Sequence, residues 1–166
     1  MQTINFIRIN SDPGEVFRLA SDVDRWPELL PHYRWVKTFW RHGSTSLVEM
    51  AARRGWIPVK WTSIQQRSEQ DLSIHYKHVA GITEGMSVKW SIVPASDGVE
   101  VTIIHDLALV KRLVSSRFGK WIVGEMFVKS IADKTLKYIK IHAEMVKGPG
   151  SMGDELSAHR PLTIDH

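Results

Sequence analysis

The sequence has no cysteine and no long apolar run, and these two absences narrow the classes of protein to which it can belong. Without cysteine, the chain forms no disulfide and offers no thiolate as a metal ligand or a nucleophile. No run of about 18 apolar residues is present to span a bilayer, and no apolar segment typical of a secretory signal is found. We therefore expect a cytoplasmic protein.

Motifs for metals, nucleotides and covalent catalysis are also missing. No Cys-x-x-Cys or His-Glu-x-x-His spacing occurs, and His75 and His78 should point to opposite faces of one strand, so they cannot chelate one ion. Glycine-rich phosphate loops and serine nucleophile motifs are absent. The formal net charge of +4 comes from basic residues spread along the chain. We expect no metal, no cofactor and no nucleic-acid partner.

The length and composition fit a single globular domain. The chain has 166 residues, of which 43% are apolar and 24% charged, and this suffices for one core. We assign residues 1–146 to a ligand-binding domain. Residues 147–166 are rich in glycine and proline and poor in large apolar residues, so we expect an extended or disordered tail.

The first part of the chain predicts one strand followed by two short helices. Thr3–Asn10 is strand-like, and Asp12 can cap a helix whose first residue is Pro13. A second short helix is predicted to begin at Asp24, and Pro31 should end it.

Six further strands are predicted where apolar and polar residues alternate. They are Tyr33–Arg41, Ser46–Arg53, Val59–Arg67, Leu72–Val79, Met86–Val93 and Val99–Leu109. Their connections are short, so neighbouring strands should pair antiparallel.

A long helix is predicted over residues 118–146, which contain no proline. The stripe that should face the sheet comprises Trp121, Gly124, Val128, Ile131, Ala132, Thr135, Ile139, Ala143 and Val146. Val123, Met126 and Phe127 lie off this stripe, so we expect them to contact a membrane surface, a second copy of the chain or an overlying loop.

This order of elements predicts an α+β fold in which a seven-stranded curved antiparallel sheet wraps around the long helix. A curved sheet rarely closes tightly on a single helix. A cavity for an apolar ligand is therefore expected between the two layers.

The segment 16–30 (VFRLASDVDRWPELL) resembles the first-helix region of the START-like (Bet v 1-like, SRPBCC) superfamily, in its polyketide cyclase/dehydrase branch. Trp61, Trp90 and the segment 132–137 fit the same pattern. The resemblance implies a helix-grip fold with a hydrophobic cavity, but it does not by itself imply catalysis.

The resemblance also implies particular pocket positions. Residues that line the cavity mouth in the aromatic-polyketide cyclases correspond here to Trp26, Leu30 and Tyr33, and Ser63 falls on a polar pocket position. Those cyclases carry an arginine where this chain has Gln65. A cation that could polarise a substrate carbonyl is thus missing from its expected place.

Strand parity puts polar residues on the inner face of the sheet. Ser63, Gln65 and His105 share that face with Trp61 and Trp90. A buried polar group without a partner costs about 1–3 kcal/mol, so these residues favour a wet cavity or a polar ligand group. His105 is the candidate acid/base, with an expected pKa suited to proton transfer near neutral pH. The structural alternative is that His105 only hydrogen-bonds within the core and the tryptophans only fill it.

We predict that the protein binds a hydrophobic, aromatic or isoprenoid, small molecule between sheet and long helix. The candidate ligand-binding residues are Trp26, Leu30, Tyr33, Trp61, Ser63, Gln65, Trp90, Ile103, His105, Val128 and Ala132. Three alternatives stay open. One is a cofactor-free aromatase/cyclase for a polyketide-like substrate, with His105 as acid/base. Another is a carrier or chaperone similar to the coenzyme Q-binding proteins, and the third is a toxin-antitoxin or stress-related member of the superfamily.

Overall fold

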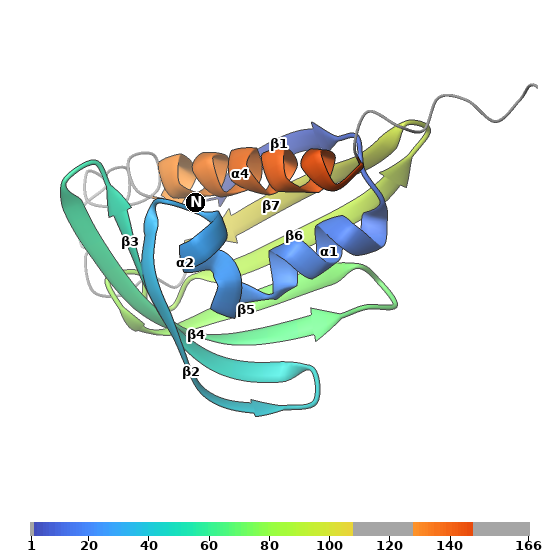
Figure 1. Cartoon of the computed structure of the whole chain (residues 1–166). Coiled ribbons are helices and arrows are strands. Elements are labelled where there is room, and N and C mark those ends of the chain that lie inside the picture. The colour runs from blue at the N-terminus through green and yellow to red at the C-terminus, as the bar shows by residue number, and fades with distance from the viewer. Residues whose placement is uncertain (1, 108–127, 148–166) are drawn as a thin grey trace, which may run out of the picture.

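The structure is a computed structural model that describes residues 2–107 and 128–147 (Figure 1). The elements are β1 (Gln2–Ile9), α1 (Pro13–Ser21), the 3-10 helix η1 (Val23–Arg25), α2 (Trp26–Leu29), β2 (Tyr33–His42), β3 (Thr45–Arg54), β4 (Ile57–Ser68), β5 (Ser73–Gly81), β6 (Ser87–Ala95), β7 (Gly98–Asp106) and α4 (Lys129–Lys147). The seven predicted strands and the two short helical segments are confirmed. The predicted long helix is confirmed from residue 129 onward; its first part, with Val123, Met126 and Phe127, lies outside the described residues, as does the predicted tail beyond residue 147.

The strands form one antiparallel sheet in the order β1-β7-β6-β5-β4-β3-β2. Figure 1 shows this sheet curving around α4, with α1 and α2 on the same side as α4. The register shifts between Tyr33 and Trp35, between Thr38 and Trp40, and between Thr62 and Ser63. Such bulges bend a strand and increase its twist, which suits a sheet that has to wrap around a helix.

Short-range signals in the sequence determine how β1 leads into α1. The Asp12 side chain accepts a hydrogen bond from the backbone N–H of Glu15 at 3.1 Å, and Pro13 occupies the first turn, as predicted.

Gly98, at the start of β7, packs against the end of β1 with φ of 142°. A Cβ atom at this position would lie 2.1 Å from the carbonyl oxygen of Ile9, so only glycine fits.

Polar contacts attach α4 to β1 and to the segment between β1 and α1. Asn5 Nδ2 donates to Asp133 Oδ1 at 2.6 Å and to the carbonyl oxygen of Lys129 at 3.3 Å. At the other end of α4, Ser11 Oγ donates to the carbonyl oxygen of Ala143 at 3.1 Å. These contacts hold α4 along β1, so the space that remains under the helix lies toward the middle of the sheet.

The predicted stripe of α4 is confirmed between Val128 and Ala143 but not at its end. Val146 is 69% exposed, so its predicted inward position is wrong: it lies almost one turn beyond Ala143, which is fully buried. Leu136, which the stripe omitted, is 2% exposed and belongs to the core. Within residues 2–107 and 128–147, no helix has both the length and the apolar character needed to cross a bilayer.

Candidate functional site

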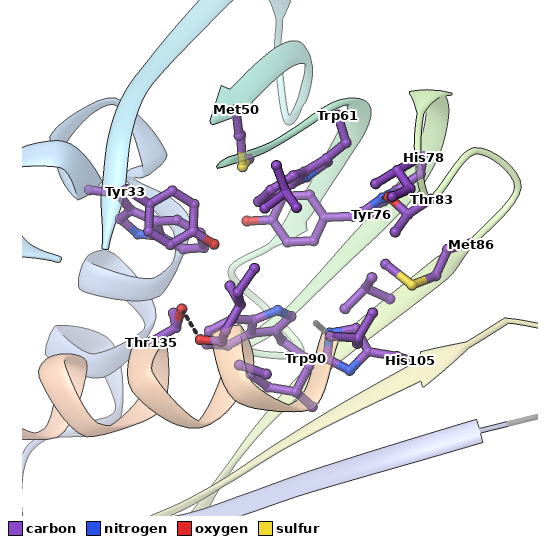
Figure 2. A pocket seen from close by; sticks show the side chains of 18 residues that line it. Tyr33, Met50, Trp61, Tyr76, His78, Thr83, Met86, Trp90, His105 and Thr135 are labelled. Carbon is purple, nitrogen blue, oxygen red and sulfur yellow. Dashed lines mark hydrogen bonds between the residues drawn. The ribbon is translucent and has the colours of Figure 1, made fainter. Parts of the chain in front are cut away.

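A pocket of about 80 Å³ lies between the concave face of the sheet and the N-terminal half of α4 (Figure 2). Its walls come from β2, β3, β4, β5, β6, β7 and α4, together with Trp26 and the loop between β5 and β6. The predicted site residues that line it are Trp26, Tyr33, Trp61, Trp90, Ile103, His105, Val128 and Ala132. The expected cavity between sheet and helix is therefore confirmed.

Aromatic rings form a continuous wall of this pocket. The ring of Trp26 lies edge-on to that of Tyr33, with centroids 4.9 Å apart, and 6.1 Å from the ring of Trp90. Tyr33 in turn meets Trp61 edge-on at 6.1 Å. Trp26 is fixed by a hydrogen bond from its Nε1 to the carbonyl oxygen of Leu19 at 3.0 Å. Strand parity predicted that Trp61 and Trp90 face the cavity, and the structure confirms it.

Three predicted site residues do not reach the pocket. Leu30 and Ser63 are buried in the core, and neither belongs to the pocket wall. Gln65 is also fully buried, and its Nε2 donates to the carbonyl oxygen of Ser21 and to Tyr76 Oη, each at 3.0 Å. Parity placed Ser63 and Gln65 on the correct face of the sheet, but that inner face extends beyond the pocket, under α1 and α2. Leu30, which the resemblance placed at the cavity mouth, packs in the core instead. Gln65 thus connects the end of α1 to the sheet.

Two tyrosine hydroxyls supply polar groups at one side of the pocket. The hydroxyls of Tyr33 and Tyr76 point toward one another in Figure 2. Burial raises the pKa of both phenols well above the ordinary value, against the opposing effect of their hydrogen bonds with Thr135 and Gln65. Both side chains therefore stay neutral and can donate a hydrogen bond at any physiological pH.

Two imidazoles occupy the other side. His78 Nδ1 lies 2.6 Å from Thr83 Oγ1, and the His78 ring stacks on that of Trp61, with centroids 5.9 Å apart and 3° between the planes. His105 is 7% exposed, and its Nδ1 has no hydrogen-bond partner within the described part of the chain. Figure 2 shows His78, Thr83, Met86 and His105 together at this side.

Both imidazoles are neutral in this environment. Burial lowers the pKa of His105 to about 4. Burial, with repulsion from His105 and Lys77, lowers the pKa of His78 to about 3. The expectation of a near-neutral pKa for His105 is therefore wrong, because burial removes the imidazolium from water and so disfavours the charged form.

The predicted site omitted several residues that line the pocket, among them two residues of β5 and two of the turn that follows it. Tyr76 and His78 lie on the inner face of β5, and their parity could have been read from the buried Ile74. Ile82 and Thr83 come from the turn after β5, which has no periodicity to follow. This turn is positioned by Gly81, whose φ is 99° and where a Cβ would lie 2.5 Å from the carbonyl oxygen of Lys60.

The chemistry available in the pocket is that of neutral groups. No Lys, Arg, Asp or Glu of residues 2–107 and 128–147 lines it. The same residues contain no group of three or more His, Asp or Glu side chains that could hold a metal ion. The arrangement can bury an apolar ring and hydrogen-bond to oxygen atoms at its edges.

Comparisons with known proteins place these features in a family. Residues 9–137 match the family described as "Polyketide cyclase / dehydrase and lipid transport". Comparison with curated protein sequences gives no match. The structure is similar to the Zhui aromatase/cyclase from Streptomyces sp. R1128, with a TM-score of 0.76 and 16% identity over 90% of this chain and 98% of that chain.

Two further solved structures show the same fold. A START superfamily protein from Mycobacterium smegmatis has a TM-score of 0.70 and 15% identity, covering 87% of this chain and 98% of that chain. The di-domain ARO/CYC StfQ from the steffimycin biosynthetic pathway has a TM-score of 0.75 and 16% identity, covering 89% of this chain and 52% of that chain. The structural likeness confirms the helix-grip fold, and the match over residues 9–137 shows that the chain belongs to the family described as polyketide cyclase / dehydrase and lipid transport.

Proposed function

We propose that this protein binds a compact, hydrophobic aromatic molecule in the pocket between the sheet and α4. The observation that carries this proposal is the wall of Trp26, Tyr33, Trp61 and Trp90, whose neighbouring ring centroids are 4.9 to 6.1 Å apart. Aromatic faces and edges pack well against a flat ring. Binding sites for small molecules are typically apolar with a few placed polar groups, and this pocket has that composition.

The size of the pocket favours a compact ligand. Its volume of about 80 Å³ is smaller than the roughly 150 Å³ of an engineered protein cavity that binds benzene. A ligand must therefore displace side chains as it enters. Met50 and Met86 line the pocket, and methionine changes its conformation at low cost, so they are suited to this movement. An extended polyketide or a long isoprenoid tail would require a much larger expansion than one or two fused rings.

The electrostatics favour binding over aromatase/cyclase chemistry. A general base works best when its pKa lies near the operating pH, whereas burial lowers the pKa of His105 to about 4. A cyclase also needs a group that stabilises the enolate oxygen formed during reaction. The lining residues that the structure describes include no cation for this purpose and offer only neutral donors, such as the hydroxyls of Tyr33 and Tyr76. Holding or delivering a ligand requires neither feature.

Tryptophan fluorescence tests the proposal. Titration with 2-naphthol should quench the emission of the full chain in a saturable manner, and the quenching should weaken in Trp61→Phe and Trp90→Phe. Trp56→Phe is the matched control, because Trp56 is 88% exposed and does not line the pocket. Ala132→Phe should abolish the saturable signal, since Ala132 lines the pocket and a phenyl group there would fill it. Quenching that survives all three pocket substitutions would contradict the proposal.

The natural ligand can be sought separately. Native mass spectrometry of the full chain purified from its own host should detect a bound neutral molecule of low polarity. The same preparation of Ala132→Phe should lack it.

A further inference from the structure

We infer that His78 and His105 together form the polar end of the pocket and select an uncharged ligand that carries a hydroxyl or carbonyl oxygen over its anionic counterpart. This inference rests on the proposed function, because it specifies the chemical class of ligand for the same pocket. It assigns a recognition role to His78, whose position on the inner face became apparent only in the structure.

The two imidazoles are held in place for such a contact. His78 is fixed through Nδ1 by Thr83 and through its ring face by Trp61, which leaves Nε2 as the ring nitrogen available to a ligand. The register of the sheet pairs Tyr76 with Val88 and Val88 with His105, so the inner faces of β5, β6 and β7 bring the two histidines to one region. The buried Nδ1 of His105 is unpartnered within the described residues, and such a group costs free energy unless a ligand or water satisfies it.

The hydrogen-bonding capacity of neutral imidazoles matches a neutral oxygen group. A neutral imidazole has one donor and one acceptor nitrogen, so a pair can serve a hydroxyl, which both donates and accepts, or donate to a carbonyl oxygen. An ionised carboxylate only accepts, and burying it without a cation is costly. Among the described lining residues there is no lysine or arginine to neutralise it.

The groups that surround the two histidines keep them neutral. The side chains that face them from β4, β6 and α4, such as Trp61, Trp90 and Val128, do not titrate. Tyr33 and Tyr76 are the other titratable residues of the lining that the structure describes, and burial raises the pKa of both. Lys77 turns to the outer face, where its Nζ donates to the carbonyl oxygen of Gly85 at 3.0 Å, and its charge further opposes protonation of His78.

Because the described part of the pocket wall holds only neutral groups, an anionic ligand should bind only if one proton is taken up at the same time. The proton would reside on an imidazole or on the carboxylate itself, and in both cases one proton is taken up for each molecule bound. The affinity for an anionic ligand should therefore fall by about tenfold per pH unit as the pH rises, whereas that for a neutral ligand should not change.

Paired probes with the same ring system test this inference. Binding of 2-naphthol and 2-naphthoate to the wild-type full chain would be measured by isothermal titration between pH about 6 and about 8, a range in which the first probe stays neutral and the second ionised. We expect a constant affinity for 2-naphthol and an affinity for 2-naphthoate that falls about tenfold per pH unit, with uptake of one proton. Tight binding of 2-naphthoate with no pH dependence would overturn the inference.

Substitutions then test whether the histidines are responsible. His78→Leu and His105→Leu should each weaken 2-naphthol binding by roughly tenfold, while His105→Gln, which keeps a donor and an acceptor, should retain most of it. His75→Leu is the matched control, because His75 lies on the exposed face of the same strand as His78. Undiminished 2-naphthol binding by both leucine variants would overturn the assignment. Failure of 2-naphthol to bind the wild-type chain would instead refute the proposed function.

Discussion

The Gln65→Leu variant tests whether Gln65, a buried polar residue near the pocket, stabilises the fold rather than binds the ligand. Gln65→Leu removes two hydrogen bonds of 3.0 Å and leaves the carbonyl oxygen of Ser21 and the hydroxyl of Tyr76 without this donor. Each lost bond contributes about 1 kcal/mol, and burying an unpaired partner adds to the loss. The substitution also removes the amide oxygen of Gln65, which is buried and has no partner among the described residues, and this offsets part of the cost. We expect a net loss of about 1–3 kcal/mol in the free energy of unfolding.

Urea denaturation and thermal melting measure this loss. For a domain of this size, the melting temperature should fall by about 2–4 °C for each kcal/mol. Gln66→Leu is the matched control, because Gln66 is the next residue and is exposed on the outer face; its effect should stay within about 0.5 kcal/mol. A double-mutant cycle with Tyr76→Phe should reveal coupling between the two side chains.

The affinity for 2-naphthol separates a structural role of Gln65 from a role in ligand binding. Gln65 does not line the pocket, so Gln65→Leu should bind 2-naphthol nearly as well as the wild type at a temperature where both are folded. Unchanged stability together with lost binding would refute this reasoning and restore Gln65 as a ligand-binding residue.

Three further predictions concern the stability of the fold. Asp12→Ala should lower the free energy of unfolding by about 0.5–2 kcal/mol in urea titrations, because the N–H of Glu15 loses its acceptor; no change would contradict the capping role. Gly98→Ala should destabilise the protein severely, since a Cβ would lie 2.1 Å from the carbonyl oxygen of Ile9, and an unchanged melting temperature would refute that packing. Burial lowers the pKa values of His32 and His105 to about 4 and that of His78 to about 3, so the unfolded chain binds more protons below its histidine pKa of about 6.5. The free energy of unfolding should therefore fall as the pH drops from about 6.5 toward 4, and a flat profile in urea titrations over this range would contradict the burial of these neutral side chains.

Most of the fold could be predicted because its signals are local. Alternation along the strands placed Trp61, Trp90 and His105 on the buried face, and the side chain of Asp12 marked the start of α1. These signals depend on a period of two or on a cap, both of which can be read within a few residues. Periodicity failed at Val146, where the helix continues beyond the surface that it packs on.

The pocket could be predicted only in part, because its extent depends on contacts between distant segments. Parity showed that Gln65 faces inward but not that α1 lies over it, and the bond from Gln65 to Ser21 joins residues 44 positions apart. Thr83 reaches the pocket from a turn that depends on the left-handed backbone of Gly81. The lowered pKa of His105 likewise results from burial by several strands and α4, which no local pattern encodes.

The central claim, that an uncharged aromatic ligand occupies the pocket between sheet and α4, is tested most directly by nuclear magnetic resonance. The side-chain indole N–H signals of the tryptophans would be assigned by single substitution and followed during titration with 2-naphthol. We predict that the signals of Trp26, Trp61 and Trp90 shift and saturate together, because these rings line the pocket. The signals of Trp40 and Trp56, which are 45% and 88% exposed, should stay in place. Shifts at Trp40 or Trp56 without shifts at the three pocket tryptophans would contradict the account.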